Sequence, residues 1–154
     1  MLIKGTILIT GAAGFTGVHF VNQAISLGYE CIALVKDTPD KTLPCKTLAA
    51  DLLDNNKLLK ALEPLSIDYV VHLAAISFVP HGSFDDIYRT NIVGTVNLLD
   101  ALIKTQSSIR KVLVASSGNV YGNSKHLPIT EESAIEPVND YAVSKSAMEQ
   151  AIAI

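Results

Sequence analysis

The chain has 154 residues, enough for one domain with a hydrophobic core, and 49% of them are apolar. Its 12 basic and 15 acidic residues are mixed along the sequence and give a formal net charge of -3, without the basic stripe that nucleic acid or an anionic membrane surface attracts. We therefore expect a soluble protein with no nucleic acid or membrane as partner.

Short runs of branched apolar residues alternate along the chain with longer segments of helical spacing. The expected strands lie near Thr6–Thr10, Glu30–Val35, Cys45–Ala49, Asp68–Leu73 and Arg110–Ser116. The expected helices carry apolar residues three or four positions apart: Val18, Val21 and Ile25; Leu58, Leu59 and Leu62; Ile92, Val96, Leu99 and Ile103. Strands that are apolar throughout are typical of a parallel sheet covered on both faces. The pattern predicts one α/β domain over residues 1–154, doubly wound, with surface loops at 37–44 and 123–139.

The N-terminal apolar run Ile7–Ile9 is too short for a signal peptide, and glycines interrupt the uncharged stretch that follows. A cytoplasmic location is therefore expected. Cys31 and Cys45 have neither CxxC nor metal-ligand spacing, so we interpret both as packed apolar residues and expect no metal site.

Three glycines follow the first expected strand and open the first expected helix, in the segment from Thr10 to Gly17. In a dinucleotide-binding turn, Gly11 would permit the tight turn, Gly14 the approach of a pyrophosphate and Gly17 close helix packing. An ordinary glycine-rich turn is the alternative. The position directly after the first strand of an α/β pattern favours a dinucleotide site in a Rossmann-type sheet.

The residue that ends the second strand helps select the cofactor, because the adenosine ribose lies beside it. That position is Val35, and Lys36 follows with a charge suited to the 2'-phosphate of NADP. Asp37, one residue further on, would favour NAD instead. The sequence predicts NADP and leaves NAD open.

Tyr141 and Lys145 form a YxxxK arrangement, whose two ends lie one turn apart on the same face of a helix. Reduction of a carbonyl by hydride needs a proton for the new alkoxide, and the reverse reaction needs a base. A phenol has a pKa of about 10, and a lysine ammonium at about 4 Å stabilises its phenolate by up to about 4 kcal/mol at an effective dielectric near 20. The pair is therefore suited to proton transfer.

Several segments occur in an order that resembles the extended short-chain dehydrogenases, of the NAD-dependent epimerase/dehydratase type. They are the GxxGxxG turn, Asp51-Leu52, the HLAA segment from His72 to Ala75, Asn91-xx-Gly-Thr, the SSxxVYG segment from Ser116 to Gly122, and YxxxK. The resemblance implies Ser117, Tyr141 and Lys145 as the catalytic residues, with the Ser117 hydroxyl donating to the substrate oxygen. It implies cofactor contacts from Gly11, Gly14, Phe15, Thr16, Gly17, Lys36, Asp51, Leu52, Leu73, Ala74, Ala75, Asn91, Ser116, Tyr141 and Lys145.

The two residues after Ser117 limit the reactions that the resemblance allows. Dehydratases of this family carry an acidic pair there, whereas this chain has Gly118 and Asn119. The resemblance is greatest to GDP-6-deoxy-4-keto-mannose reductases, which implies reduction of a 4-keto-6-deoxy sugar nucleotide, with substrate contacts from Ser77, Val79 and Asn119. A UDP-sugar 4-epimerase is the alternative within the family, and a non-catalytic dinucleotide-binding module is the alternative outside it.

Members of the family are about twice this long and bind the sugar nucleotide with a C-terminal region. The resemblance therefore implies that the C-terminal part of the family fold is missing from this sequence. It also implies a homodimer for the full-length enzyme.

Overall fold

The computed structural model describes residues 3–37, 42–77, 83–125 and 127–153, and five of its segments form one sheet. The strands are β1 (Thr6–Thr10), β2 (Glu30–Val35), β3 (Lys46–Ala49), β4 (Tyr69–His72) and β5 (Lys111–Val114). Neighbouring strands pair in parallel in the order β3-β2-β1-β4-β5. The order reverses at β1, and in open α/β sheets the switch point between β1 and β4 is where ligands bind.

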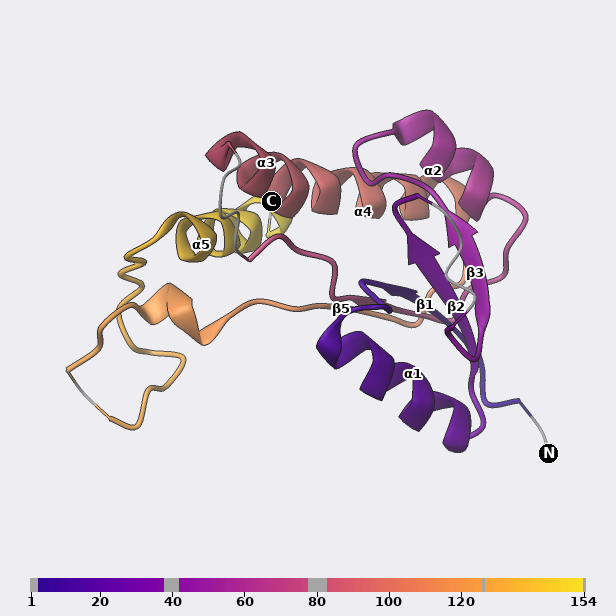
Figure 1. Cartoon of the computed structure of the whole chain (residues 1–154), viewed down its shortest axis with the longest axis horizontal. Helices are drawn as coiled ribbons and strands as arrows, with labels where there is room; N and C mark the ends of the chain where they lie inside the picture. The colour runs from indigo at the N-terminus through magenta and orange to yellow at the C-terminus, as the bar shows by residue number, and fades with distance from the viewer. Residues whose placement is uncertain (1–2, 38–41, 78–82, 126, 154) are drawn as a thin grey trace. The chain divides into compact units, whose positions relative to one another are not determined.

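Helices follow most of the strands along the chain (Figure 1). They are α1 (Phe15–Ser26), α2 (Asn55–Leu62), α3 (Phe84–Tyr88), α4 (Gly94–Thr105) and α5 (Asp140–Ile152), with a π-helical turn η1 (Arg89–Val93) and a 3-10 turn η2 (Gly118–Tyr121). Among the described residues, no helix is long and apolar enough to cross a membrane.

The chain divides into two compact units. We call residues 1–74 and 97–115 the sheet unit, and residues 75–96 and 116–154 the helical unit. The sheet unit holds all five strands, α1, α2 and most of α4. The helical unit holds α3, η1, η2 and α5. The expected single domain over residues 1–154 stays a prediction.

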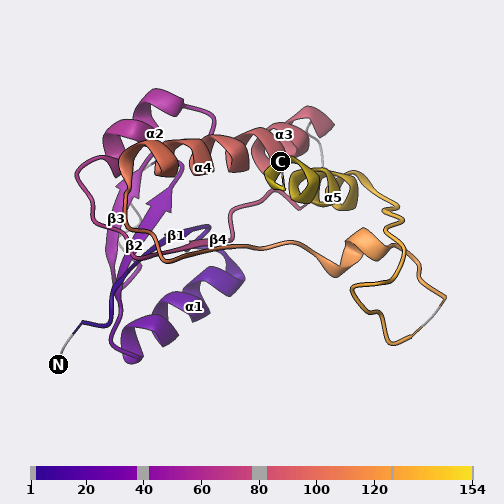
Figure 2. The same cartoon turned by 180° about the vertical axis from the view of Figure 1, so that it is seen from behind.

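The two faces of the sheet carry separate hydrophobic clusters. Along β1, Leu8 belongs to the cluster shared with α2 and α4, whereas Ile7 and Ile9 belong to the cluster under α1. Figure 2 shows α1 on one side of the sheet and α2 and α4 on the other. The prediction of a doubly wound, Rossmann-type parallel sheet with helices on both faces is confirmed.

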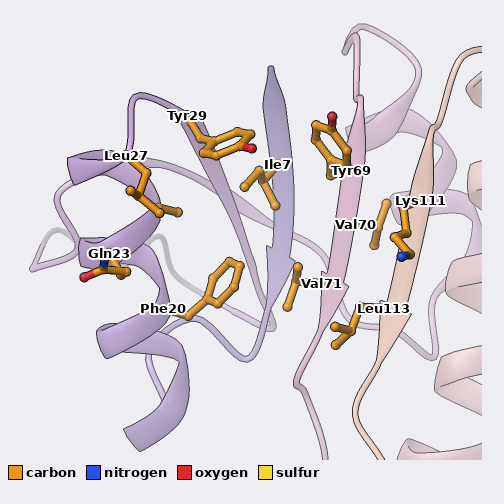
Figure 3. Close-up of a pocket in the computed structure, with 11 residues that line it drawn as sticks. Ile7, Phe20, Gln23, Leu27, Tyr29, Tyr69, Val70, Val71, Lys111 and Leu113 are labelled. Carbon is orange, nitrogen blue, oxygen red and sulfur yellow. The ribbon is translucent and has the colours of Figure 1, made fainter. Parts of the chain in front are cut away.

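An apolar groove of about 310 Å³ lies in the sheet unit between α1 and the strands β4 and β5. Figure 3 shows Phe20 of α1 directed toward Val71 and Leu113 of the strands. The rings of Tyr29 and Tyr69 meet edge to face at 5.9 Å at the end of the groove. Leu113 is 51% exposed, because α1 covers this face of the sheet only in part.

The expected strands were placed correctly but were too long in three cases. β3 begins at Lys46 rather than Cys45, β4 covers Tyr69–His72, and β5 covers Lys111–Val114. The extra residues lie at either end of these strands, outside the paired register of the parallel sheet. The sequence analysis also missed α3, η1 and η2, and the helix expected from Ile92 begins as α4 only at Gly94.

Candidate functional site

The glycine turn leaves β1 and crosses the end of β4 within the sheet unit. Gly11 has a φ of +68°, a conformation that L side chains rarely adopt, and a Cβ atom there would lie 2.6 Å from the amide nitrogen of Ala74. A Cβ atom on Gly17 would overlap the carbonyl oxygen of Gly11. The turn therefore needs glycine at both positions, for reasons of local packing that hold without a ligand.

The N-terminus of α1 presents backbone amides without a protein acid to bind them. Gly14 is the N-cap, it provides no side chain, and the first turn contains no acidic residue. Phe15 is 87% exposed and packs edge to face on His19 at 5.2 Å. Because the first amides of a helix lack intrahelical partners and attract anions, this end of α1 suits a phosphate group.

The end of β4 is fixed to β1 by a buried hydrogen-bond chain that the sequence analysis missed. The Thr10 hydroxyl lies 2.6 Å from His72 Nδ1, and the Ala74 N–H donates to Thr10 Oγ1 at 3.2 Å. Leu73 N–H donates to the Thr10 carbonyl at 3.1 Å. Thr10 thus sets the path of the HLAA segment over the glycine turn. The contact between Thr10 and His72 could be predicted only from the pairing of β1 with β4, which the sequence alone does not show.

Two expected cofactor residues, Lys36 and Asp51, contact each other. Lys36 Nζ lies 3.4 Å from Asp51 Oδ2, with the lysine side chain largely exposed. Asp51 Oδ1 accepts from Leu53 N–H at 2.9 Å, whereas the N-cap of α2 is Asp54, which accepts from Lys57 N–H. Asp51 is therefore not the helix cap.

Leu52, another expected cofactor-binding residue, packs mainly into the protein. Its side chain belongs to the cluster under α2 and α4, and its carbonyl accepts from Asn97 Nδ2 at 2.9 Å. A cofactor contact from Leu52 stays a prediction, as does that from Lys36 or Asp51.

Tyr141 and Lys145 lie one turn apart on α5, in the helical unit. The helix is capped by Asn139, whose side chain accepts from Ala142 N–H at 2.8 Å. Lys145 is only 2% exposed, and this burial lowers the pKa of its ammonium, an effect partly opposed by the negative charge of Glu149. Tyr141 is half-buried and lies one turn before this buried cation on the same helix.

Ser117 caps the 3-10 turn η2, which α5 contacts within the helical unit. Its hydroxyl accepts from Asn119 N–H at 3.2 Å. The turn is held by Glu136 N–H, which donates to the Val120 carbonyl at 3.0 Å, and by Gly122, where a Cβ atom would overlap the Glu136 carbonyl oxygen. Ser117 is therefore on an anchored turn beside the helix that carries Tyr141 and Lys145. Ser116 and Asn119 are exposed.

Asn91 is completely buried in the π-helical turn η1 and binds two segments of the helical unit. Its Oδ1 accepts from Ile76 N–H at 2.8 Å, and its Nδ2 donates to the Ile76 carbonyl and to Ser144 Oγ, both at 2.9 Å. Ser144 Oγ in turn donates to the Tyr141 carbonyl at 2.7 Å. The sequence analysis missed Ser144. Both N–H bonds of the Asn91 amide are used within the protein, so its expected cofactor contact stays a prediction.

The remaining expected site residues follow β4. Ala75 is half-buried and Ser77 exposed, whereas Val79 lies outside the described residues. The structure thus joins the glycine turn to Leu73 and Ala74 in the sheet unit. In the helical unit it brings together Tyr141, Lys145 and Asn91, with Ser117 on a turn that α5 contacts.

Comparison with known families identifies the chain. The model of the NAD dependent epimerase/dehydratase family matches residues 7–153. The chain therefore belongs to this family, and the resemblance found in the sequence is confirmed.

Individual relatives agree with the family assignment. The chain is 31% identical over 153 residues to a UDP-glucose 4-epimerase of Lactobacillus helveticus, covering 96% of this chain and 46% of the relative. It is 32% identical over 148 residues to a GDP-6-deoxy-D-talose 4-dehydrogenase of Aggregatibacter actinomycetemcomitans, covering 95% and 47%. The chain spans about half the length of the curated relatives it matches.

A solved structure of UDP-glucose 4-epimerase from Brucella ovis, in complex with NAD, superposes on this fold with a TM-score of 0.84. The identity is 31%, and the match covers 97% of this chain and 47% of that one.

Proposed function

We propose that the chain binds a nicotinamide dinucleotide and carries the proton-transfer groups of an enzyme that oxidises and reduces a nucleotide-linked sugar at one carbinol carbon. The observation that carries the proposal is the placement of the half-buried Tyr141 one turn from the buried Lys145 on α5. A pure binding module has no need of this pair or of a serine hydroxyl on the adjacent turn.

The proton chemistry follows from these side chains. The Tyr141 phenolate would accept the proton of the sugar hydroxyl as the carbon is oxidised, and return it when the carbonyl is reduced. Lys145 would stabilise the phenolate, because an ammonium in a desolvated position interacts more strongly with a neighbouring charge than it would in water. The Ser117 hydroxyl would donate a hydrogen bond to the reacting oxygen as negative charge develops there. The nicotinamide ring, when bound, accepts and returns the hydride.

The cofactor-binding residues proposed for the sheet unit fit a dinucleotide pyrophosphate. The glycine turn exposes backbone close to the N-terminal amides of α1, where an anion is favoured. NAD as the cofactor is supported by the family to which the chain belongs and by the NAD bound in the Brucella ovis epimerase. The preference for NADP rests on Lys36 and is weakened by its ion pair with Asp51, because a paired cation is less available to a 2'-phosphate. We therefore propose NAD as the main cofactor.

The reaction that the comparisons favour is 4-epimerisation of a UDP-sugar. It is supported by the similarity to UDP-glucose 4-epimerase over 96% of this chain. A second candidate is oxidation or reduction at carbon 4 of a GDP-linked 6-deoxy sugar, which the similarity to GDP-6-deoxy-D-talose 4-dehydrogenase supports. The 4-keto-6-deoxy sugar reductase expected from the sequence is of this second kind. Gly118 and Asn119 provide no acid for dehydration in either case.

The two reactions are distinguished by what happens to the cofactor. An epimerase with NAD in trace amounts should convert UDP-galactose into UDP-glucose without net NADH formation. A dehydrogenase should instead form NADH in step with oxidation of GDP-6-deoxy-talose, measured at 340 nm. Tyr141→Phe should lower the rate of epimerisation or of oxidation, whichever the protein catalyses, at least about 100-fold. The decisive sample is a protein that also contains the C-terminal region of the family fold: if it binds NAD and converts neither substrate, the non-catalytic binding module is left as its function. Sedimentation of the same sample tests the expected homodimer.

A further inference from the structure

The hydroxyl of Ser144 lies at the centre of a hydrogen-bond chain inside the helical unit. The chain runs from the Ile76 backbone through the Asn91 side chain and the Ser144 hydroxyl to the Tyr141 carbonyl. Asn91 and Ser144 are both 0% exposed. The hydrogen-bond chain thereby connects Tyr141, the proposed proton donor, to the segment that leads to Ser77, an expected substrate residue.

The direction of each hydrogen bond is fixed by the chemistry of the groups. The Ile76 N–H can only donate, so it requires the oxygen of the Asn91 amide, and this excludes the flipped amide. The amide nitrogen can only donate, and Ser144 Oγ must therefore accept from it. The hydroxyl has a single proton left to give, which goes to the Tyr141 carbonyl at 2.7 Å. The hydroxyl at position 144 thus both accepts and donates, which an alkyl side chain cannot do.

Asn91 lies in the π-helical turn η1. In η1 the chain departs from regular α-helical bonding, and the Asn91 carbonyl accepts from the Thr95 hydroxyl at 2.7 Å. Such turns often occur at functional sites.

We propose that Ser144 is a positioning residue, which together with Asn91 holds Tyr141 in a fixed place relative to segment 75–77. Tyr141 needs such support because it lies at the second residue of α5, in the first turn, where helices fray. A displacement of about 1 Å in a reacting group can lower a rate about 100-fold. The inference rests on the proposed role of Tyr141, but the contacts that carry it are independent of any substrate.

The test compares four samples: the wild-type chain, Ser144→Ala, Ser144→Thr and Ser146→Ala. Ser144→Ala removes the oxygen and leaves an Asn91 N–H without its acceptor. Ser144→Thr keeps the hydroxyl, since a helical threonine can also bond to a carbonyl in the preceding turn. Ser146 is buried on the same helix next to Lys145 and lies outside the chain of hydrogen bonds, so Ser146→Ala is the matched control.

Two signals are measured by NMR, without cofactor or substrate. One is the hydrogen-exchange rate of the Ile76 amide, and the other is the Tyr141 Cζ resonance in tyrosine-labelled protein, assigned by its loss in Tyr141→Phe. We expect Ser144→Ala to raise the Ile76 exchange rate about tenfold and to shift the Tyr141 resonance, while Tyr29 and Tyr69 stay unchanged. Ser144→Thr should restore both signals toward wild type, and Ser146→Ala should alter neither.

The proposal is overturned if Ser144→Ala leaves the Ile76 exchange rate and the Tyr141 resonance as in wild type, or if Ser146→Ala changes them equally. Ser144→Cys, whose thiol is a weaker donor and acceptor, should give changes in the same direction as Ser144→Ala and keeps the test valid if the alanine variant does not fold. Because no turnover is measured, failure here is distinguishable from failure of the proposed enzymatic function.

Discussion

Lys36 and Asp51 form an ion pair of 3.4 Å that joins the residue after β2 to the second residue after β3. Both were expected to contact the cofactor, Lys36 through the 2'-phosphate of NADP. The structure places them in contact with each other, so the charge of one controls the availability of the other. At the proposed cofactor site, we therefore expect the preference between NAD and NADP to depend on both residues together.

Asp51→Asn should therefore strengthen binding of the NADP half-ligand 2',5'-ADP. Surface ion pairs contribute up to about 1 kcal/mol, so release of Lys36 should lower the dissociation constant by at most about fivefold. Calorimetry at two salt concentrations measures this, with 5'-AMP as the ligand that lacks the 2'-phosphate. Lys36→Gln is the opposing control and should weaken 2',5'-ADP alone. Equal changes for both ligands in Asp51→Asn would contradict the coupling.

Gly17→Ala should destabilise the sheet unit and abolish dinucleotide binding. The added methyl group overlaps the Gly11 carbonyl oxygen, and rigid backbone can relieve this only by moving α1 away from the turn, at a cost of about 2–3 kcal/mol. Gly118→Ala is the matched control, because no atom lies within 4 Å of a Cβ there. Urea unfolding and NADH fluorescence should be near wild type for Gly118→Ala. Normal NADH binding by Gly17→Ala would argue against the proposed pyrophosphate site.

The sequence predicts those parts of the fold whose signal is local. Apolar runs placed all five strands, and the glycine spacing placed the turn, because Gly11 and Gly17 are required by backbone contacts within a few residues and at the end of the next strand. The short helix α3 was missed because Ile87 is its only buried residue, too few to show a helical period.

The supporting residues of the candidate site were missed for a different reason. Thr10 contacts His72 across 62 positions, and Asn91 contacts Ser144 across 53. A threonine at a strand end or a serine in a helix carries no local sign of such a partner. Pairing of this kind depends on which strands and helices become neighbours, which spacing along the chain does not encode.

The Cys31 thiol should be unreactive in the folded protein. It is 3% exposed, and burial, with smaller effects from Cys45 and Glu30, raises its pKa to about 11. At pH 8 an aromatic disulfide reagent should modify Cys31 only at the rate of unfolding, with rapid reaction in urea. The folded state binds the thiol proton more tightly than the unfolded state does. The contribution of the protonated Cys31 to the free energy of unfolding is therefore complete below pH 9 and is lost as the pH rises toward 11. Cys31→Val should lose that pH dependence; if it retains the wild-type profile, another group is responsible.

Leu113→Lys should improve solubility with little effect on stability. Leu113 is 51% exposed on β5, which is the outer strand of the described sheet, and exposed apolar edge strands promote association. The expected change in unfolding free energy is within about 0.5 kcal/mol. Light scattering during concentration measures the effect. Val71→Lys is the contrasting variant, because Val71 is buried in the cluster under α1, and it should unfold the chain.

Lys145→Met should stabilise the protein at neutral pH while removing the proposed activity. Burial lowers the Lys145 pKa, so the folded state binds the ammonium proton less tightly than the unfolded state does. The contribution of Lys145 to the free energy of unfolding is complete above the pKa of the unfolded state, near 10.5, and is lost as the pH falls through the lower pKa of the folded state. At pH 7 the charged lysine therefore lowers the stability of the fold. Replacement of the buried charge by an apolar side chain of similar length should therefore raise Tm at pH 7, and the gain should shrink toward pH 10.5.

Lys104→Met, on the exposed side of α4, controls for the loss of a surface charge and should change Tm little at either pH. In the assay with UDP-galactose, Lys145→Met should lower conversion at least about 100-fold, because in the proposed mechanism the reacting group of Tyr141 would lose its stabilising cation. A gain in stability coupled to a loss of turnover is the expected signature of a charge that is buried for catalysis rather than for folding. If Lys145→Met instead lowers Tm at pH 7 and does so equally at pH 10, the lysine stabilises the fold through its contacts, and its burial no longer indicates a catalytic role.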